Sequence, residues 1–172
     1  GSAASATCAE EQASPQVPTD LALCAALAPI VRKPSALPLN EYQAKLGEYL
    51  RNFCHRDETS GWKVDKRVRD TGPWVGTYAN GRWAGNYCGT HAPALVWYSP
   101  DMYAWLKANR PGAGAHPPAQ AQQIPDGAII VKEMYRAPAA ACARVDPLHL
   151  RPDNEGAAIM VRDSGASHDG WF

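Results

Sequence analysis

The sequence lacks the features of several common protein classes. Its longest apolar stretch, residues 21–31, is interrupted by Pro29 and is too short to cross a bilayer. Lysine plus arginine and aspartate plus glutamate each number 17, so no net charge attracts a nucleic-acid backbone or an anionic membrane surface. No Ser-His-Asp arrangement, phosphate-binding glycine loop or acidic pair stands out. We therefore expect no membrane span and no nucleic-acid partner, and the sequence identifies no catalytic residue.

Cysteine is present, but without the Cys-x-x-Cys spacing of a zinc ribbon. The five cysteines lie far apart, at Cys8, Cys24, Cys54, Cys88 and Cys142. This spacing favours disulfides formed in an oxidising compartment, so we predict a periplasmic or secreted protein. We expect Cys8 to pair with Cys24 and Cys54 with Cys88, which leaves Cys142 over.

A zinc site is the weaker alternative for two of these cysteines. Cys54 precedes His55, and Cys88 precedes His91 by three positions. Adjacent cysteine and histidine residues are poorly spaced for tetrahedral ligation, and the context favours oxidation. We therefore predict no metal site.

The length predicts one domain. Residues 1–19 are rich in alanine, serine, glutamine and proline, which predicts a flexible N-terminal tail. Residues 20–172 form the expected domain. The final Trp171 and Phe172 look like the start of a strand, and such a strand would be left unpaired. We therefore expect the domain to be incomplete at its C-terminus.

Helical signals are concentrated in the first third of the chain. Asp20 is suited to cap a helix over residues 21–28 that ends at Pro29, and Asn40 to cap a second helix. In the second helix the apolar stripe consists of Tyr42, Leu46, Tyr49, Leu50 and Phe53. Ser99 and Pro100 begin a third, short helix.

Strand signals dominate the remainder. Alternating or apolar runs predict strands over residues 62–68, 74–78, 82–87, 94–98, 128–135 and 156–162. Asn80-Gly81 is suited to a tight hairpin turn, and residues 137–152 have the composition of a loop. The predicted fold is α+β and mainly β: an antiparallel sheet with N-terminal helices and one short helix between strands.

The strand over residues 128–135 contains the residue of greatest functional interest. Alternation places Lys132 on a face with Ile130 and Met134, while Glu133 shares the other face with Val131. Lys132 is either a lysine whose stem lies along an apolar surface near a sheet edge, or a lysine that faces a ligand cavity. We attribute Glu133 to a solvated face.

Three segments together resemble the central stretch of the cytochrome P-460 family. They are residues 98–107 (Tyr-Ser-Pro-Asp-Met-Tyr-Ala-Trp-Leu-Lys), 125–134 (Pro-Asp-Gly-Ala-Ile-Ile-Val-Lys-Glu-Met), and 161–164 with 170–172 (Val-Arg-Asp-Ser and Gly-Trp-Phe). Members of that family are periplasmic c-type cytochromes, mostly antiparallel β and usually homodimeric. Some oxidise hydroxylamine at a haem that is cross-linked to a lysine, and Lys132 occupies the position of that lysine.

The sequence departs from the family in two ways. It contains no Cys-x-x-Cys-His segment, which in the family attaches haem c covalently, so attachment would have to lie outside this chain. Ala94 and Ala158 occupy the positions of the distal arginine and glutamate of the hydroxylamine-oxidising members.

The resemblance therefore implies an extracytoplasmic haem-binding domain that serves electron transfer or small-ligand binding. If the protein is an enzyme, it is expected to be a haem-dependent oxidoreductase. The alternative is a haem-free binding or interaction module, braced by disulfides, that keeps the same fold. Neither interpretation identifies the small-molecule ligand or the redox partner.

Overall fold

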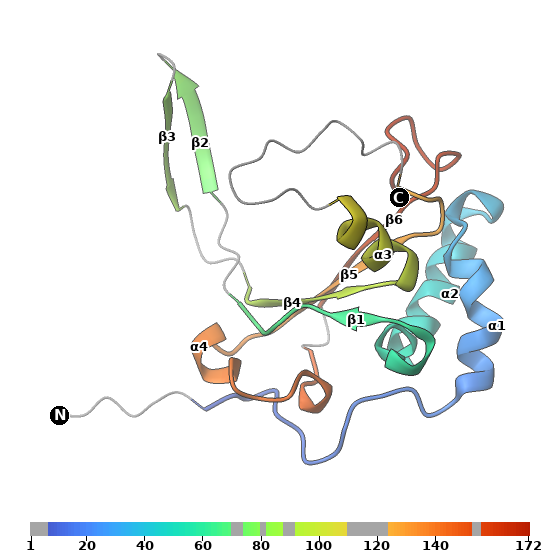
Figure 1. Ribbon diagram of the computed structural model, residues 1–172, viewed down its shortest axis with the longest axis horizontal. Coiled ribbons are helices and arrows are strands. Elements are labelled where there is room, and N and C mark those ends of the chain that lie inside the picture. The colour runs from blue at the N-terminus through green and yellow to red at the C-terminus, as the bar shows by residue number, and fades with distance from the viewer. Residues whose placement is uncertain (1–6, 70–73, 80–81, 88–91, 110–123, 153–155) are drawn as a thin grey trace.

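The computed structural model describes residues 7–69, 74–79, 82–87, 92–109, 124–152 and 156–172 (Figure 1). The helices are α1 (Leu21–Val31), α2 (Leu39–Arg51), α3 (Pro100–Asn109) and α4 (Ala139–Cys142). The strands are β1 (Lys63–Val64), β2 (Trp74–Ala79), β3 (Arg82–Tyr87), β4 (Ala94–Tyr98), β5 (Ile129–Met134) and β6 (Ala157–Val161). Strands β1, β4, β5 and β6 form an antiparallel sheet in the order β1-β4-β5-β6, and β2 pairs with β3 separately. The predicted α+β class is confirmed.

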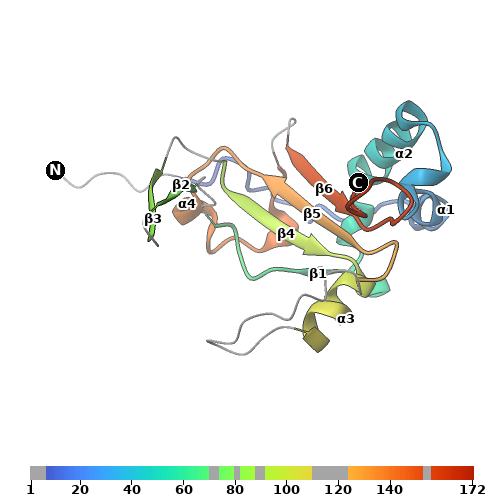
Figure 2. The same ribbon diagram turned by 90° about the horizontal axis from the view of Figure 1, so that it is seen from above.

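The four-stranded sheet separates two apolar clusters. The larger cluster joins α1 and α2, which lie side by side, to one face of the sheet (Figures 1 and 2). The smaller cluster packs α3 against part of the sheet through Met102 and Ala128, with Tyr98 and Ile130 at its edge. One face of the sheet is therefore the core of the protein, and the other is covered over part of its length.

Helix α1 begins where the sequence predicts but ends later. The Asp20 carboxylate accepts a hydrogen bond from the Leu23 amide at 2.9 Å, which confirms the predicted cap. The helix then continues through Pro29 to Val31, so the predicted end at Pro29 is wrong. Val31 is fully buried, and its carbonyl accepts a hydrogen bond from the Tyr42 hydroxyl at 2.7 Å. These tertiary contacts stabilise a last turn that the proline alone would disfavour.

Helix α2 has the predicted buried face and a different start. Tyr42, Leu46 and Tyr49 are buried at helical spacing. The helix begins at Leu39, so Asn40 lies inside its first turn and does not cap it. The residue before the helix is Pro38, which makes no side-chain capping bond.

The sheet strands follow the predicted alternation with shifted ends. The strand predicted over residues 62–68 is paired only at β1, although Arg69 makes one further bridge to Ala94. The hairpin of β2 and β3 is confirmed, and its Asn80-Gly81 turn lies outside the described residues. Ser99 Oγ accepts from the Met102 amide at 3.4 Å, as expected for the start of α3. The region predicted as loop over residues 137–152 contains α4 and a short 3-10 helix, Pro147–His149.

Two disulfides connect distant parts of the chain. They join Cys8 to Cys142 and Cys24 to Cys54. The predicted pairs Cys8–Cys24 and Cys54–Cys88 are therefore wrong, and Cys142 is not left over. Cys88 lies outside the described residues. The wrong pairing assumed that cysteines near in sequence pair with each other, whereas the fold brings together residues up to 134 positions apart.

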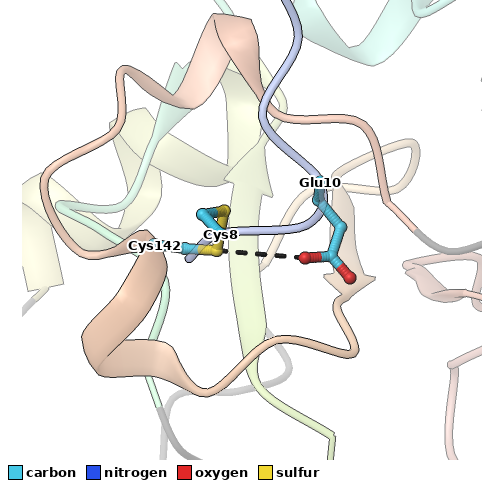
Figure 3. Close-up of side chains that lie close together, drawn as sticks. All are labelled: Cys8, Glu10 and Cys142. Atoms are coloured by element: carbon cyan, nitrogen blue, oxygen red, sulfur yellow. Dashed lines mark hydrogen bonds between the residues drawn. A yellow bond between two sulfur atoms is a disulfide. The ribbon is translucent and has the colours of Figure 1, made fainter. Parts of the chain in front are cut away.

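The N-terminal segment is part of the fold from Cys8 onwards, so the predicted tail over residues 1–19 is wrong for this segment. The Glu10 carboxylate is 5% exposed and accepts hydrogen bonds from the Arg136 amide at 2.8 Å and the Ala137 amide at 3.2 Å. The backbone of the neighbouring Glu11 forms an isolated antiparallel β-bridge with Leu150. Figure 3 shows the Glu10 carboxylate beside the disulfide that anchors this segment to the end of α4.

The last two residues pair with the sheet. The sequence-based expectation that they start an unpaired strand is therefore wrong. The Phe172 amide donates to the Val161 carbonyl at 2.9 Å and its carbonyl accepts from the Val161 amide at 3.0 Å. The Phe172 ring contacts the Tyr42 ring edge-on, with centroids 4.7 Å apart. This pairing places the last two residues beside the end of β6 and in contact with α2.

Candidate functional site: the two faces of strand β5

Strand β5 lies between β4 and β6 and therefore has a neighbour on each side. The register places Lys132 opposite Val96 of β4 and opposite Ala158 of β6. Ala94 pairs with Met134, two positions further along the same face. Cross-strand partners in an antiparallel sheet project to the same side. The three positions singled out from sequence, Ala94, Lys132 and Ala158, thus share one face of the sheet.

The surroundings of Lys132 are apolar and only partly covered. Val96, Ile130 and Met134 are half-buried around it, and Met160 is 46% exposed. Among the residues that the structure describes, none makes a hydrogen bond or ion pair with the Lys132 amine. We name the side chains of Val96, Lys132, Met134, Ala158 and Met160 the Lys132 face. It is an open apolar surface with one cation at its centre.

The opposite face of β5 carries Glu133, whose carboxylate is 1% exposed. Its Oε2 accepts hydrogen bonds from His55 Nε2 at 3.0 Å, and from Arg56 Nε at 3.0 Å and Nη2 at 2.7 Å. Its Oε1 accepts from Trp97 Nε1 at 2.6 Å and from the Tyr135 hydroxyl at 3.2 Å. The interpretation of Glu133 as a solvated residue is wrong: it lies at the centre of a buried polar network.

The partners of Glu133 decide its charge. Burial alone would raise the pKa of the carboxyl group, but the hydrogen bond from His55 and the positive charge of Arg56 hold that pKa below its ordinary value. Burial, followed by the Glu133 charge, raises the pKa of the Tyr135 hydroxyl. Glu133 is thus an anion and Tyr135 a neutral donor at neutral pH. The arrangement is an ion pair with saturated oxygens, which leaves Glu133 no free lone pair for proton transfer.

His55 is the one member of this network with an unused polar atom. Its ring is 3% exposed, and its Nδ1 is buried without a hydrogen-bond partner among the described residues. Because the Glu133 carboxylate only accepts, His55 carries a proton on Nε2. In the tautomer with the hydrogen on Nε2, Nδ1 is a hydrogen-bond acceptor.

One group of described residues brings three potential metal-ligand atoms close together. Cys8, Glu10 and Cys142 place ligand atoms within 4.8 Å of one another, and Cys142 Sγ lies 3.9 Å from Glu10 Oε2 (Figure 3). Both sulfurs are bonded in the disulfide, however, and no thiolate is available. The zinc site considered as an alternative would use Cys54 and His55. Cys54 is bonded in a disulfide, and His55 binds Glu133. The other two residues of that alternative, Cys88 and His91, lie outside the described residues.

Comparison with known proteins identifies no family for this chain. No protein-family model matches the chain, and neither a curated protein nor a solved structure matches it. Within the described residues no helix has the length and apolar character needed to cross a membrane. The two faces of β5 are therefore the structural features from which a function can be inferred.

Proposed function

We propose that this chain is an extracytoplasmic haem-binding domain that holds the haem against the Lys132 face. The observation that carries the proposal is the environment of Lys132: an amine without a partner among the described residues, in the middle of an open apolar surface. An unpaired amine on such a surface is costly unless a ligand or solvent satisfies it. A flat, largely apolar macrocycle with charged edges suits both the apolar side chains and the cation.

The residues present fit this group in part. Val96, Met134 and Met160 would contact the macrocycle, and Lys132 would lie at its face or edge. The sequence contains no Cys-x-x-Cys-His segment. The proposal therefore places covalent attachment and the axial histidine outside this chain.

The side chains beside Lys132 limit the chemistry. When bound, haem supplies one-electron and gas-ligand chemistry, and the protein controls access and electronics. Ala94 and Ala158 offer no group that donates or accepts a proton. Electron transfer or binding of a small ligand is therefore the proposed activity, ahead of hydroxylamine oxidation.

The proposed setting is the periplasm or the exterior of the cell. The two disulfides are typical of oxidising compartments. A homodimer and a redox partner follow only from the resemblance and belong to the same proposal.

The absence of the haem motif favours a second candidate function. A haem-free module would use the Lys132 face to bind a different ligand or a partner, on a scaffold held by the same two disulfides. Under this alternative Lys132 would pair with an acidic group of the partner.

Absorption spectroscopy distinguishes the two candidates. The protein, with its natural ends, is produced in a haem-maturing periplasm, and denaturing electrophoresis with haem staining follows. A Soret band retained after denaturation is expected, and Lys132→Ala should change the spectrum. The matched control is Lys66→Ala, because Lys66 is exposed and belongs neither to β5 nor to the strands that pair with it. A colourless, folded protein would contradict the haem proposal and favour the haem-free module.

A further inference from the structure

A second site lies on the other side of the sheet, away from the Lys132 face. A pocket of about 660 Å³ is located between the end of α2, the turn that follows it, and the beginning of β6. Its lining includes Leu50, Arg51, Phe53, His55, Arg151 and Ala157. None of these residues belongs to the proposed haem surface.

The described residues that line this pocket carry more positive than negative charge. Arg51 and Arg151 line it and are exposed, and neither forms an ion pair with a described residue. Glu133 also lines it, but its charge is matched by that of the buried Arg56 at 2.7 Å. Among the described residues, two guanidinium groups therefore remain without a counter-charge. Guanidinium is the cation best suited to form bidentate hydrogen bonds to carboxylate or phosphate oxygens.

The pocket lining includes the residue with the unused polar atom described above. His55 lines the pocket, and its Nδ1 is buried without a partner. A buried polar atom without a partner costs free energy, and in native proteins it calls for a specific explanation. Because Nδ1 is an acceptor, a ligand whose body carries a hydrogen-bond donor would satisfy it, while its carboxylate binds elsewhere in the pocket.

The local backbone is also unusual at this point. Phe53 has φ of 55° and ψ of 29°, and it is the one residue other than glycine with positive φ among the described residues. A bulky residue in this conformation costs roughly 1–3 kcal/mol and persists where surrounding contacts impose it. Here the Arg56 guanidinium lies 5.0 Å from the Phe53 ring centroid, so the strained turn also holds the ring at the pocket wall.

From these observations we propose that the pocket binds a small organic carboxylate. The carboxylate lies between Arg51 and Arg151, and the apolar body lies on Leu50 and Phe53. The apolar wall distinguishes this ligand from inorganic phosphate, which would use the charge alone. The proposal is independent of haem, because no residue is shared with the Lys132 face.

The test uses benzoate as the carboxylate with an apolar body and benzamide as its neutral counterpart. Binding to the full chain is followed by amide chemical shifts, with Gly47 and Gly156 as reporters because both line the pocket. Benzoate should give saturable shifts, and benzamide should bind at least about tenfold more weakly, since it lacks the charge-assisted hydrogen bonds. Arg51→Ala and Arg151→Ala should each weaken benzoate binding about tenfold.

Arg67→Ala is the matched control, because Arg67 is an exposed arginine that does not line the pocket. It should leave benzoate affinity unchanged. Equal binding of benzoate and benzamide, equal weakening by Arg67→Ala, or no saturable shift would overturn the proposal. Phosphate that binds as tightly as benzoate would overturn the organic-ligand assignment, because the apolar wall would then contribute nothing.

Discussion

Lys132 and Glu133 follow each other in β5, and their side chains lie in opposite environments. Glu133 is 1% exposed and accepts five hydrogen bonds from four side chains, whereas Lys132 is half-buried and has no partner among the described residues. One strand thus presents a saturated ion pair to the core and, on its other face, a half-buried cation without a described protein partner among apolar side chains. The first arrangement is suited to stability, and the second to recognition of a ligand.

The largest effect is expected for removal of the buried anion. Glu133→Ala leaves Arg56 buried without its counter-charge, and breaking a buried pair in this way costs about 3–5 kcal/mol of unfolding free energy. Urea denaturation followed by tryptophan fluorescence measures the loss. Lys132→Ala is the matched control, and it should change stability by no more than about 0.5 kcal/mol because its amine has no described partner. Equal losses in the two variants would contradict the division between the faces.

A second pair of substitutions tests the apolar side chains of the same two faces. Val131 is 1% exposed on the Glu133 side, and Met160 is 46% exposed on the Lys132 face. Val131→Ala should cost about 2 kcal/mol, from lost burial and the cavity left behind. Met160→Ala should cost less than about 1 kcal/mol in the absence of ligand. Thermal denaturation of both variants provides the measurement, and a larger loss at Met160 would show that this face is covered.

The environments of Lys132 and Glu133 were only partly predictable from sequence. Alternation correctly assigned Glu133 to the face of Val131 and Lys132 to the face of Met134. It did not identify the environment of Glu133, because the residues that neutralise it, His55 and Arg56, are 78 and 77 positions away. A carboxylate that shares a face with isoleucine and valine was the available signal that a cation must be near.

The same limit explains the other differences between sequence and structure. Local rules placed the cap of α1 at Asp20 and the start of α3 at Ser99, because both depend on neighbouring residues. They failed for the end of α1, where burial of Val31 outweighs the effect of Pro29, and for the Cys8–Cys142 disulfide. Contacts between distant segments decide such features, and a single sequence does not encode them in any local pattern.

The charge state of Glu133 makes the stability of the folded protein depend on pH. The pKa of Glu133 is lower in the folded protein than in the unfolded chain, so the unfolded state binds more protons as the pH falls. The stability from this group is fully present above the unfolded pKa and is lost as the pH falls through the folded one. Urea unfolding between neutral and acidic pH should therefore show a decline that is smaller in Glu133→Gln. An identical decline in both proteins would assign it to other carboxylates, of which Asp163 also has a lowered pKa.

The smallest effect on stability, and the most informative for function, is expected for Lys132→Met. Methionine keeps an unbranched apolar stem and removes the charge, so the unfolding free energy should change by no more than about 0.5 kcal/mol. If the Lys132 face binds an anionic or electron-rich ligand, the same variant should lose that ligand while remaining folded, which circular dichroism and ligand titration measure together. If a folded Lys132→Met protein still binds the ligand, the Lys132 amine does not contribute to ligand binding. The apolar side chains of the Lys132 face would then account for it. A large loss of stability would instead show that the Lys132 amine has a structural partner, and the distinction between the two faces of β5 would not hold.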